Sequence, residues 1–171
     1  MKHILPILTI TTLAAAASAQ SASSGLSYNR VGLGYNTDSK GYSLSASALI
    51  GGSNFLVEAE TSIGGGSTVN GADTDSVALG YVFKNVAFGA DATVSVGSDE
   101  AYGLNVRKDL GIYNLELAAS FGRNSSDVNV WGAELAYNVS KQIQLAVGYS
   151  DSNAVGAAGK GQTDISVRYN F

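Results

Sequence analysis

Hydrophobic and polar residues alternate along most of this chain, and the alternation is clearest over its last nine residues, 163–171. The apolar members there are Ile165, Val167, Tyr169 and Phe171. A period of two is the pattern of a β-strand that has one apolar and one polar face. The same pattern recurs and predicts ten strands, at roughly 28–36, 41–50, 54–63, 74–83, 86–96, 101–109, 112–122, 128–138, 142–150 and 163–171.

The connections between these strands alternate in length. Short turns are predicted at Gly52-Ser53, Lys84-Asn85, Leu110-Gly111 and Val139 to Lys141. The other connections are polar or rich in glycine, two of them are long, and they lie at roughly 37–40, 64–73, 97–100, 123–127 and 151–162. Short turns at one end and longer loops at the other are typical of a transmembrane β-barrel. The predicted fold is therefore all-β, an up-and-down antiparallel transmembrane β-barrel of ten strands, with eight strands as the alternative.

Two features of the strand faces favour a membrane barrel over a soluble one. The polar faces carry mainly Gly, Ser and Ala, small side chains that fit the limited volume of a lumen. The aromatic residues of the apolar faces fall near the strand ends, and Tyr and Trp favour the membrane interface. At the end with the short turns they are Phe55, Tyr81, Phe83, Phe88, Tyr113, Tyr137, Tyr169 and Phe171. At the other end they are Tyr35, Tyr42, Tyr102, Phe121, Trp131 and Tyr149, and only Tyr28 fits neither girdle.

The N-terminal region has the pattern of an export signal. A short basic start, 1–3, precedes a mostly apolar stretch, and Ala17-Ser18-Ala19 matches the small-x-small cleavage pattern. We therefore expect a cleaved signal peptide over 1–19, a short flexible leader over 20–27 and the barrel over 28–171. Cleavage removes His3 and Pro6, the only His and the only Pro in the sequence.

Composition narrows the chemistry that the mature chain can perform. It has neither His nor Cys, so we do not expect hydrolysis or acyl transfer that depends on a His base or a Cys nucleophile. The carboxylate pair Asp73 and Asp75 lies at a loop end, where acidic residues are usually only solvated. Without Lys2 the net charge falls from -4 to -5, which offers no basic surface for nucleic acid. No enzymatic activity, catalytic residue, metal or cofactor is expected.

The export signal, the alternating strands, the girdles and the terminal Phe171 resemble the small OmpA-like or porin-like outer-membrane barrels of Gram-negative bacteria. The resemblance covers the whole mature chain, but its features are architectural and identify no subfamily. It implies a location in the outer membrane, with the lipid bilayer as partner and both termini on the periplasmic side. It also implies that the closing strand is read by the outer-membrane insertion machinery through Ile165, Val167, Tyr169 and Phe171.

Charged residues on the polar strand faces are predicted to line the lumen. The three positive and five negative charges are Arg30, Arg107 and Arg168 against Glu58, Glu60, Asp91, Glu116 and Glu134. Buried charges must be paired or hydrated, so Arg107 is expected to pair with Asp91 or Glu116. Arg30 and Arg168, on the first and last predicted strands, are expected to form ion pairs with Glu58 and Glu60.

These features leave several functions open. The first is a small porin-like diffusion pore for small solutes or ions, or a structural barrel with a charged lumen. If the lumen conducts, its excess of acid predicts a preference for small cations. The second is a surface adhesion or binding barrel that acts through its outer loops, although these loops are mostly short and lack an aromatic cluster. The third is a secreted soluble barrel that binds a lipophile.

Overall fold

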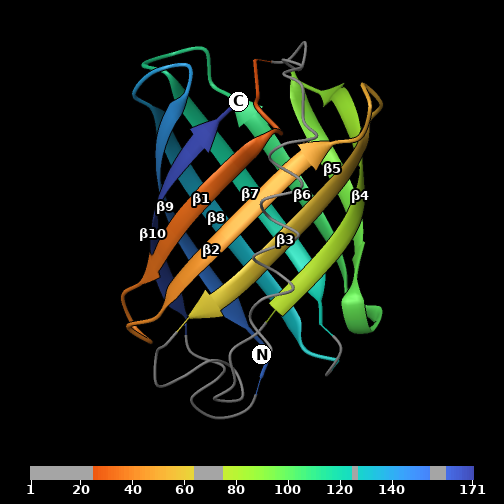
Figure 1. Ribbon diagram of the computed structural model, residues 1–171, viewed down its shortest axis with the longest axis vertical. Coiled ribbons are helices and arrows are strands. Elements are labelled where there is room, and N and C mark those ends of the chain that lie inside the picture. The colour runs from red at the N-terminus through yellow and green to blue at the C-terminus, as the bar shows by residue number, and fades with distance from the viewer. Residues whose placement is uncertain (1–24, 64–74, 125–126, 155–160) are drawn as a thin grey trace.

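The computed structural model describes residues 25–63, 75–124, 127–154 and 161–171. Its strands are β1 (Arg30–Asn36), β2 (Tyr42–Leu49), β3 (Phe55–Ile63), β4 (Asp75–Ala87), β5 (Ala90–Gly97), β6 (Tyr102–Asp109), β7 (Leu115–Arg123), β8 (Asn129–Asn138), β9 (Ile143–Ser152) and β10 (Gln162–Asn170), with a short 3-10 turn, η1 (Ser98–Glu100). They form one closed antiparallel barrel in which β1 pairs with β10 (Figure 1). The predicted all-β fold of ten strands is confirmed. Within these ranges no helix is long and apolar enough to cross a membrane.

Alternation sets the strand register, because a slip of one residue would turn every side chain to the opposite face. At the closure of the barrel Leu33 of β1 lies opposite Val167 of β10, and both are apolar. On the other face Gly32 lies opposite Arg168. The first and last strands therefore join with their apolar faces on the same side.

The barrel has two unlike ends. The turn end carries the four hairpins β2–β3, β4–β5, β6–β7 and β8–β9, together with the start of β1 and the C-terminus. It is at the top of Figure 1. The loop end carries the other connections. This arrangement matches the alternation of short turns and longer loops that the sequence predicts.

The β4–β5 hairpin turns later than predicted. Its turn is made by Phe88 and Gly89, whose φ angles are 51° and 76°. The predicted turn at Lys84-Asn85 is wrong, because β4 continues through it with an irregular register. There the amide of Asn85 donates to Oδ1 of Asp91 at 2.8 Å, a bond across the hairpin that no local pattern reveals. Phe88 consequently lies in the turn, 94% exposed, and not in a strand of the girdle.

The β6–β7 hairpin also departs from the prediction. The amide of Leu110 donates to the carbonyl of Leu115 at 2.9 Å, so residues 111–114 form the turn. The predicted two-residue turn at Leu110-Gly111 is wrong in length. Both lengths are even, so the apolar sets of the two strands still share one face. Tyr113, assigned to a strand of the girdle, lies in this turn with a φ of 52°.

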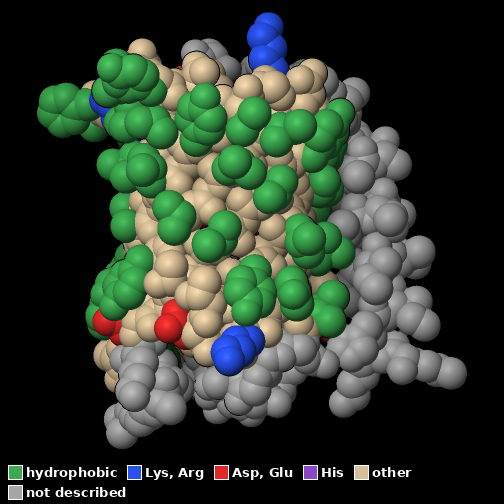
Figure 2. Space-filling model, turned by 90° about the vertical axis from the view of Figure 1, so that its left-hand side faces the viewer, with side chains coloured by type: hydrophobic (Ala, Val, Ile, Leu, Met, Phe, Trp, Pro, Cys, Tyr) green, Lys and Arg blue, Asp and Glu red, His purple; other side chains and the backbone are tan. Residues whose placement is uncertain are grey.

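The outer surface of the barrel is apolar along the strands. Its large side chains between 43% and 55% exposed include Leu33, Leu79, Val94, Leu104, Leu117, Leu135, Leu145, Val147, Ile165, Val167 and Tyr169. Figure 2 shows hydrophobic side chains spread over one face from end to end, with the visible charged side chains near its rims. Such a surface is apolar where a soluble barrel would be polar.

Aromatic side chains gather toward both ends of this surface. At the loop end the rings of Tyr35 and Tyr42 lie 5.1 Å apart. Toward the turn end the ring of Tyr81 lies 5.1 Å from Phe55 and 4.8 Å from Phe83. The other girdle residues that lie on strands with exposed side chains are Tyr102, Phe121, Trp131, Tyr137, Tyr149 and Tyr169.

Candidate functional site

The eight charged residues predicted for the lumen lie inside the barrel, in two groups. Asp91, Arg107 and Glu116 lie toward the turn end and are at most 4% exposed. The other five line a cavity of about 690 Å³ that extends to the loop end, and they are Arg30, Glu58, Glu60, Glu134 and Arg168. The lumen therefore has a packed half near the turn end and an open half near the loop end.

A network of hydrogen bonds joins the charges of the packed half. Nε of Arg107 donates to Oε1 of Glu116 at 2.6 Å, and Gln144 donates to the other oxygen of Glu116 at 3.0 Å. The Tyr28 hydroxyl donates to Oδ2 of Asp91 at 2.9 Å, and the guanidinium carbon of Arg107 lies 4.8 Å from the centre of the Tyr28 ring. Burial raises the pKa of the Tyr28 hydroxyl above its ordinary value, so it remains a hydrogen-bond donor. Charges this deeply buried need partners of this kind.

Residues 25–29, here termed the entry segment, run into the turn end of the lumen. Leu26 and Tyr28 are each 2% exposed. They form one apolar cluster with the inward-facing Leu49, Leu56 and Val82. The signal for this arrangement in the sequence is Tyr28 itself, the one aromatic residue that fits neither girdle.

Polar contacts also hold the entry segment in the lumen. The hydroxyl of Ser47 donates to the carbonyl of Tyr28 at 2.7 Å, and Arg107 donates to the carbonyl of Ser27 at 3.0 Å. Of the flexible leader expected over 20–27, residues 20–24 and the predicted signal peptide lie outside the described residues. Residues 25–27 are instead part of this packed segment, because the lumen supplies apolar and polar partners that a local sequence pattern does not contain.

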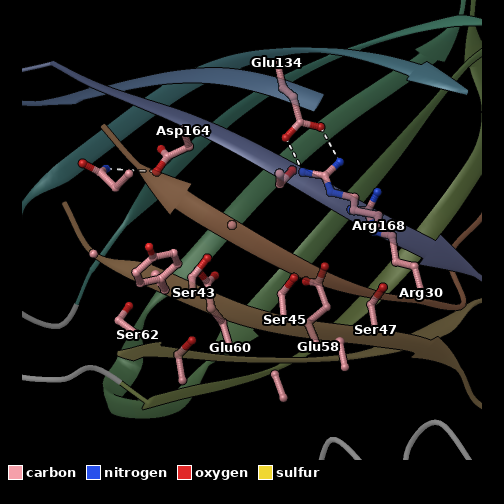
Figure 3. Close-up of a pocket in the computed structure, with 18 of the residues that line it drawn as sticks. Arg30, Ser43, Ser45, Ser47, Glu58, Glu60, Ser62, Glu134, Asp164 and Arg168 are labelled. Carbon is pink, nitrogen blue, oxygen red and sulfur yellow. Dashed lines mark hydrogen bonds and ion pairs between the residues drawn. The ribbon is translucent and has the colours of Figure 1, made fainter. Parts of the chain in front are cut away.

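Among the described residues, the open half of the lumen contains one ion pair. Figure 3 shows the two hydrogen bonds that join Arg168 and Glu134. The distance from Nη1 of Arg168 to Oε1 of Glu134 is 2.6 Å. The predicted ion pair of Arg168 with Glu58 or Glu60 is therefore wrong. Arg168 reaches Glu134, two strands away, because Gly148 lies opposite Glu134 on the intervening β9 and carries no side chain.

Arg30 occupies a central position in the lumen. It lines the cavity of about 690 Å³ and two further cavities of about 290 and 280 Å³. Its Nη1 atom is buried and has no hydrogen-bond partner among the described residues. Glu58 and Glu60 likewise form no ion pair in the part of the chain that the structure describes. The structure thus brings Arg30, Glu58 and Glu60 to one cavity without pairing them ionically.

The remaining predicted residues lie away from the lumen charges. Of the residues assigned to the insertion signal, Ile165, Val167 and Tyr169 are exposed on the outer face, and Phe171 follows the end of β10. The amide of Phe171 donates to the carbonyl of Asn29 at 3.0 Å.

Of the carboxylate pair Asp73 and Asp75, only Asp75 lies within the described residues. It is exposed at the start of β4, at the loop end, and accepts a hydrogen bond of 2.6 Å from Thr61. Within the described ranges no group of three or more His, Cys, Asp or Glu side chains is placed to hold a metal ion.

Comparison with known proteins finds similarity only among solved structures. No family model matches the chain, and no curated protein matches it. The KdgM porin is 14% identical, with a TM-score of 0.48 over 83% of this chain and 99% of that one. The NanC porin is 11% identical, with a TM-score of 0.45 over 83% of this chain and 98% of that one. The Acinetobacter baumannii outer membrane protein Omp33 is 14% identical, with a TM-score of 0.34 over 77% of this chain and 71% of that one.

Proposed function

We propose that this chain is an integral outer-membrane β-barrel that acts as a small porin-like pore with a preference for small cations, and not as an enzyme. The observation that carries the proposal is an apolar outer surface around a charged lumen that is open toward the loop end. Closure of the sheet supports it, because strands can cross hydrocarbon only when no edge is left with unpaired N–H and C=O groups. The export signal and the periplasmic position of the turn end belong to the same proposal.

Site-directed labelling tests the membrane assignment. The chain contains no Cys, so a single introduced Cys is the only thiol. Leu117→Cys on the outer surface is expected to react only with a lipid-soluble maleimide, and Ser45→Cys in the cavity with a water-soluble one. The reverse pattern, or recovery of the mature protein in a detergent-free soluble fraction, would contradict the proposal.

The preference for cations follows from the charges that line the large cavity. Two are positive and four are negative, a net of -2, and they are Arg30, Arg168, Glu58, Glu60, Glu134 and Asp164. A narrow passage with low-dielectric walls concentrates the field of its wall charges, and acidic walls favour cations. Reversal potentials in a KCl gradient across a planar bilayer are expected to show cation preference. The double substitution Glu58→Gln and Glu60→Gln is expected to weaken it, and a preference for anions would contradict it.

In this proposal the entry segment limits the conductance. Its apolar contacts narrow the turn-end half of the lumen, so ions can pass only where this packing opens. The double variant Leu26→Ser and Tyr28→Ser is expected to raise the single-channel conductance. Tyr113→Ser is the matched control, because Tyr113 lies at the same end but is 82% exposed in a turn, and it is expected to leave the conductance unchanged.

A structural barrel without transport is the second candidate, and the packed turn end favours it. The same bilayer recordings separate the two candidates. No conductance in either the wild type or the entry-segment variant would support the structural barrel and contradict the pore.

We also propose that the C-terminal strand is the signal for membrane insertion, with Phe171 as its terminal contact. Phe171→Ser is expected to lower the amount of protein in the outer membrane. Phe88→Ser removes an aromatic ring from an exposed turn at the same end of the barrel and serves as the control. Equal amounts of the two variants in the membrane would count against the signal.

A further inference from the structure

Four charged groups of the large cavity have no ionic partner in the part of the chain that the structure describes. Six charged residues line this cavity, and the pair between Arg168 and Glu134 cancels two of them. Among the described residues the other four form no ion pair, and they are Arg30, Glu58, Glu60 and Asp164. The cavity therefore retains one positive and three negative charges that are not neutralised within the lumen.

The neutral hydrogen-bond partners of these groups do not change this balance. Asn36 donates to Asp164 at 2.9 Å, and this amide carries no charge. Nη1 of Arg30 is buried without a partner in the described part of the chain, although a buried N–H normally has one. Water can hydrate such groups, but it supplies no positive charge.

The arrangement of these groups indicates what a ligand must carry. Figure 3 shows Arg30 beside Arg168 on one side of the cavity, with Glu58 and Glu60 rising from β3 on another. Glu58 and Glu60 are two residues apart on one strand face, so their backbone positions are about 7 Å apart at ~3.4 Å per residue. A matching ligand has one acceptor for Arg30 and two cationic groups separated by a similar span.

We propose that this cavity binds a basic amino acid such as lysine, with its carboxylate on Arg30 and its two ammonium groups toward Glu58 and Glu60. This inference rests on the proposed function, in which the cavity is the mouth of the pore, and it names the class of solute. The extended side chain of lysine separates its ammonium groups by a span close to the separation of the backbone positions of Glu58 and Glu60. A cavity of about 690 Å³ holds roughly twenty waters at ~30 Å³ each, which leaves room for the ligand and its hydration.

Two analogues of lysine test each half of the site separately. Cadaverine is lysine without its carboxylate, and norleucine is lysine without its side-chain ammonium. In calorimetric titrations of the purified mature protein in detergent micelles, lysine is expected to bind at least about tenfold more tightly than either, since each analogue loses a charge-assisted contact. Equal affinities for lysine and cadaverine, or for lysine and norleucine, would overturn the proposal.

Substitutions test which residues cause the differences in affinity between lysine and its two analogues. Arg30→Gln is expected to abolish the preference for lysine over cadaverine, and Glu58→Gln with Glu60→Gln the preference for lysine over norleucine. Glu100→Gln is the control, because Glu100 is exposed at the loop end and does not line the cavity. If a variant still prefers lysine over the analogue in question, the role assigned to the substituted residue is wrong. If a variant does not fold, the affinities of the wild-type protein for the three ligands decide the proposal.

Binding and conduction are measured independently, so the two proposals can fail separately. Cation-selective conductance without lysine binding would overturn this inference and leave the pore intact. Lysine binding without any conductance would overturn the pore and leave a binding barrel.

Discussion

The two halves of the lumen are built from the inner faces of the same strands, yet they differ in how their charged side chains are paired and exposed. In the packed half Arg107 and Glu116 form an ion pair, and both are almost inaccessible. In the open half Glu60 is exposed and Arg30 keeps a buried nitrogen atom without a partner among the described residues. One half holds its charges in fixed contacts, and the other presents them to a cavity.

The difference comes from what fills the space between the strands. Near the turn end the entry segment packs Leu26 and Tyr28 against the inward-facing apolar residues Leu49, Leu56 and Val82. Near the loop end the inward positions are small, including Gly34, Ser43 and Ser45, so the volume stays open. The same inner faces therefore support a plug where large side chains and the entry segment meet, and a vestibule where they do not.

The largest expected effect is the loss of the buried ion pair. Glu116→Ala is expected to lower the free energy of unfolding by about 3–5 kcal/mol, because it leaves Arg107 buried without its anion. Glu60→Ala in the open half is expected to change it by less than about 0.5 kcal/mol. Urea unfolding of the refolded barrel would measure both, and equal losses would remove the distinction between the two halves.

The next effect compares the lumen with the outer surface. Leu117→Arg places a charge on the apolar outer surface, which lies in lipid in the proposed function, and is expected to cost about 2–4 kcal/mol in a bilayer. Ser45→Arg adds the same side chain to the open cavity and is expected to cost less, because the cavity has room and carries excess acid. Unfolding in lipid vesicles would measure the difference, and a larger loss for Ser45→Arg would mean that the open half is not open.

A smaller effect is expected from the hydroxyl that ties the entry segment to the wall. Tyr28→Phe keeps the ring beneath Arg107 but removes the bond to Asp91, which is expected to cost about 1–2 kcal/mol. Tyr137→Phe, on the exposed outer face, serves as the control. If both variants unfold at the wild-type urea concentration, the hydroxyl contributes nothing to the packed half.

The smallest effect comes from two serines on one strand face of β2. The hydroxyl of Ser47 donates to the entry segment, so Ser47→Ala is expected to cost about 0.5–1.5 kcal/mol. Ser45 lies nearer the loop end and lines the cavity, and Ser45→Ala is expected to change stability by less than about 0.5 kcal/mol. A loss for Ser45→Ala that equals the loss for Ser47→Ala would contradict the boundary between the halves.

The strands, their two faces and the end that carries the short hairpins can be predicted from local patterns in the sequence. Alternation predicts the ten strands and their two faces, and it assigns Arg107, Glu116 and the other charges to the inner face, since a residue's side of a strand depends only on its parity. The spacing of turn residues also predicts which end carries the short hairpins. Each of these predictions depends only on residues close together in the sequence, so it can be made without the structure.

The tertiary structure decided what depends on residues far apart in the chain. The β4–β5 turn lies at Phe88 and Gly89, not at the predicted position, because Asn85 forms a hydrogen bond to Asp91 across the hairpin. Arg168 pairs with Glu134 because Gly148, on the strand between them, has no side chain. The entry segment is the clearest case: alternation cannot show that residues 25–29 enter the lumen. Their burial depends on the space that Leu49, Leu56 and Val82 enclose only after β1 has closed on β10.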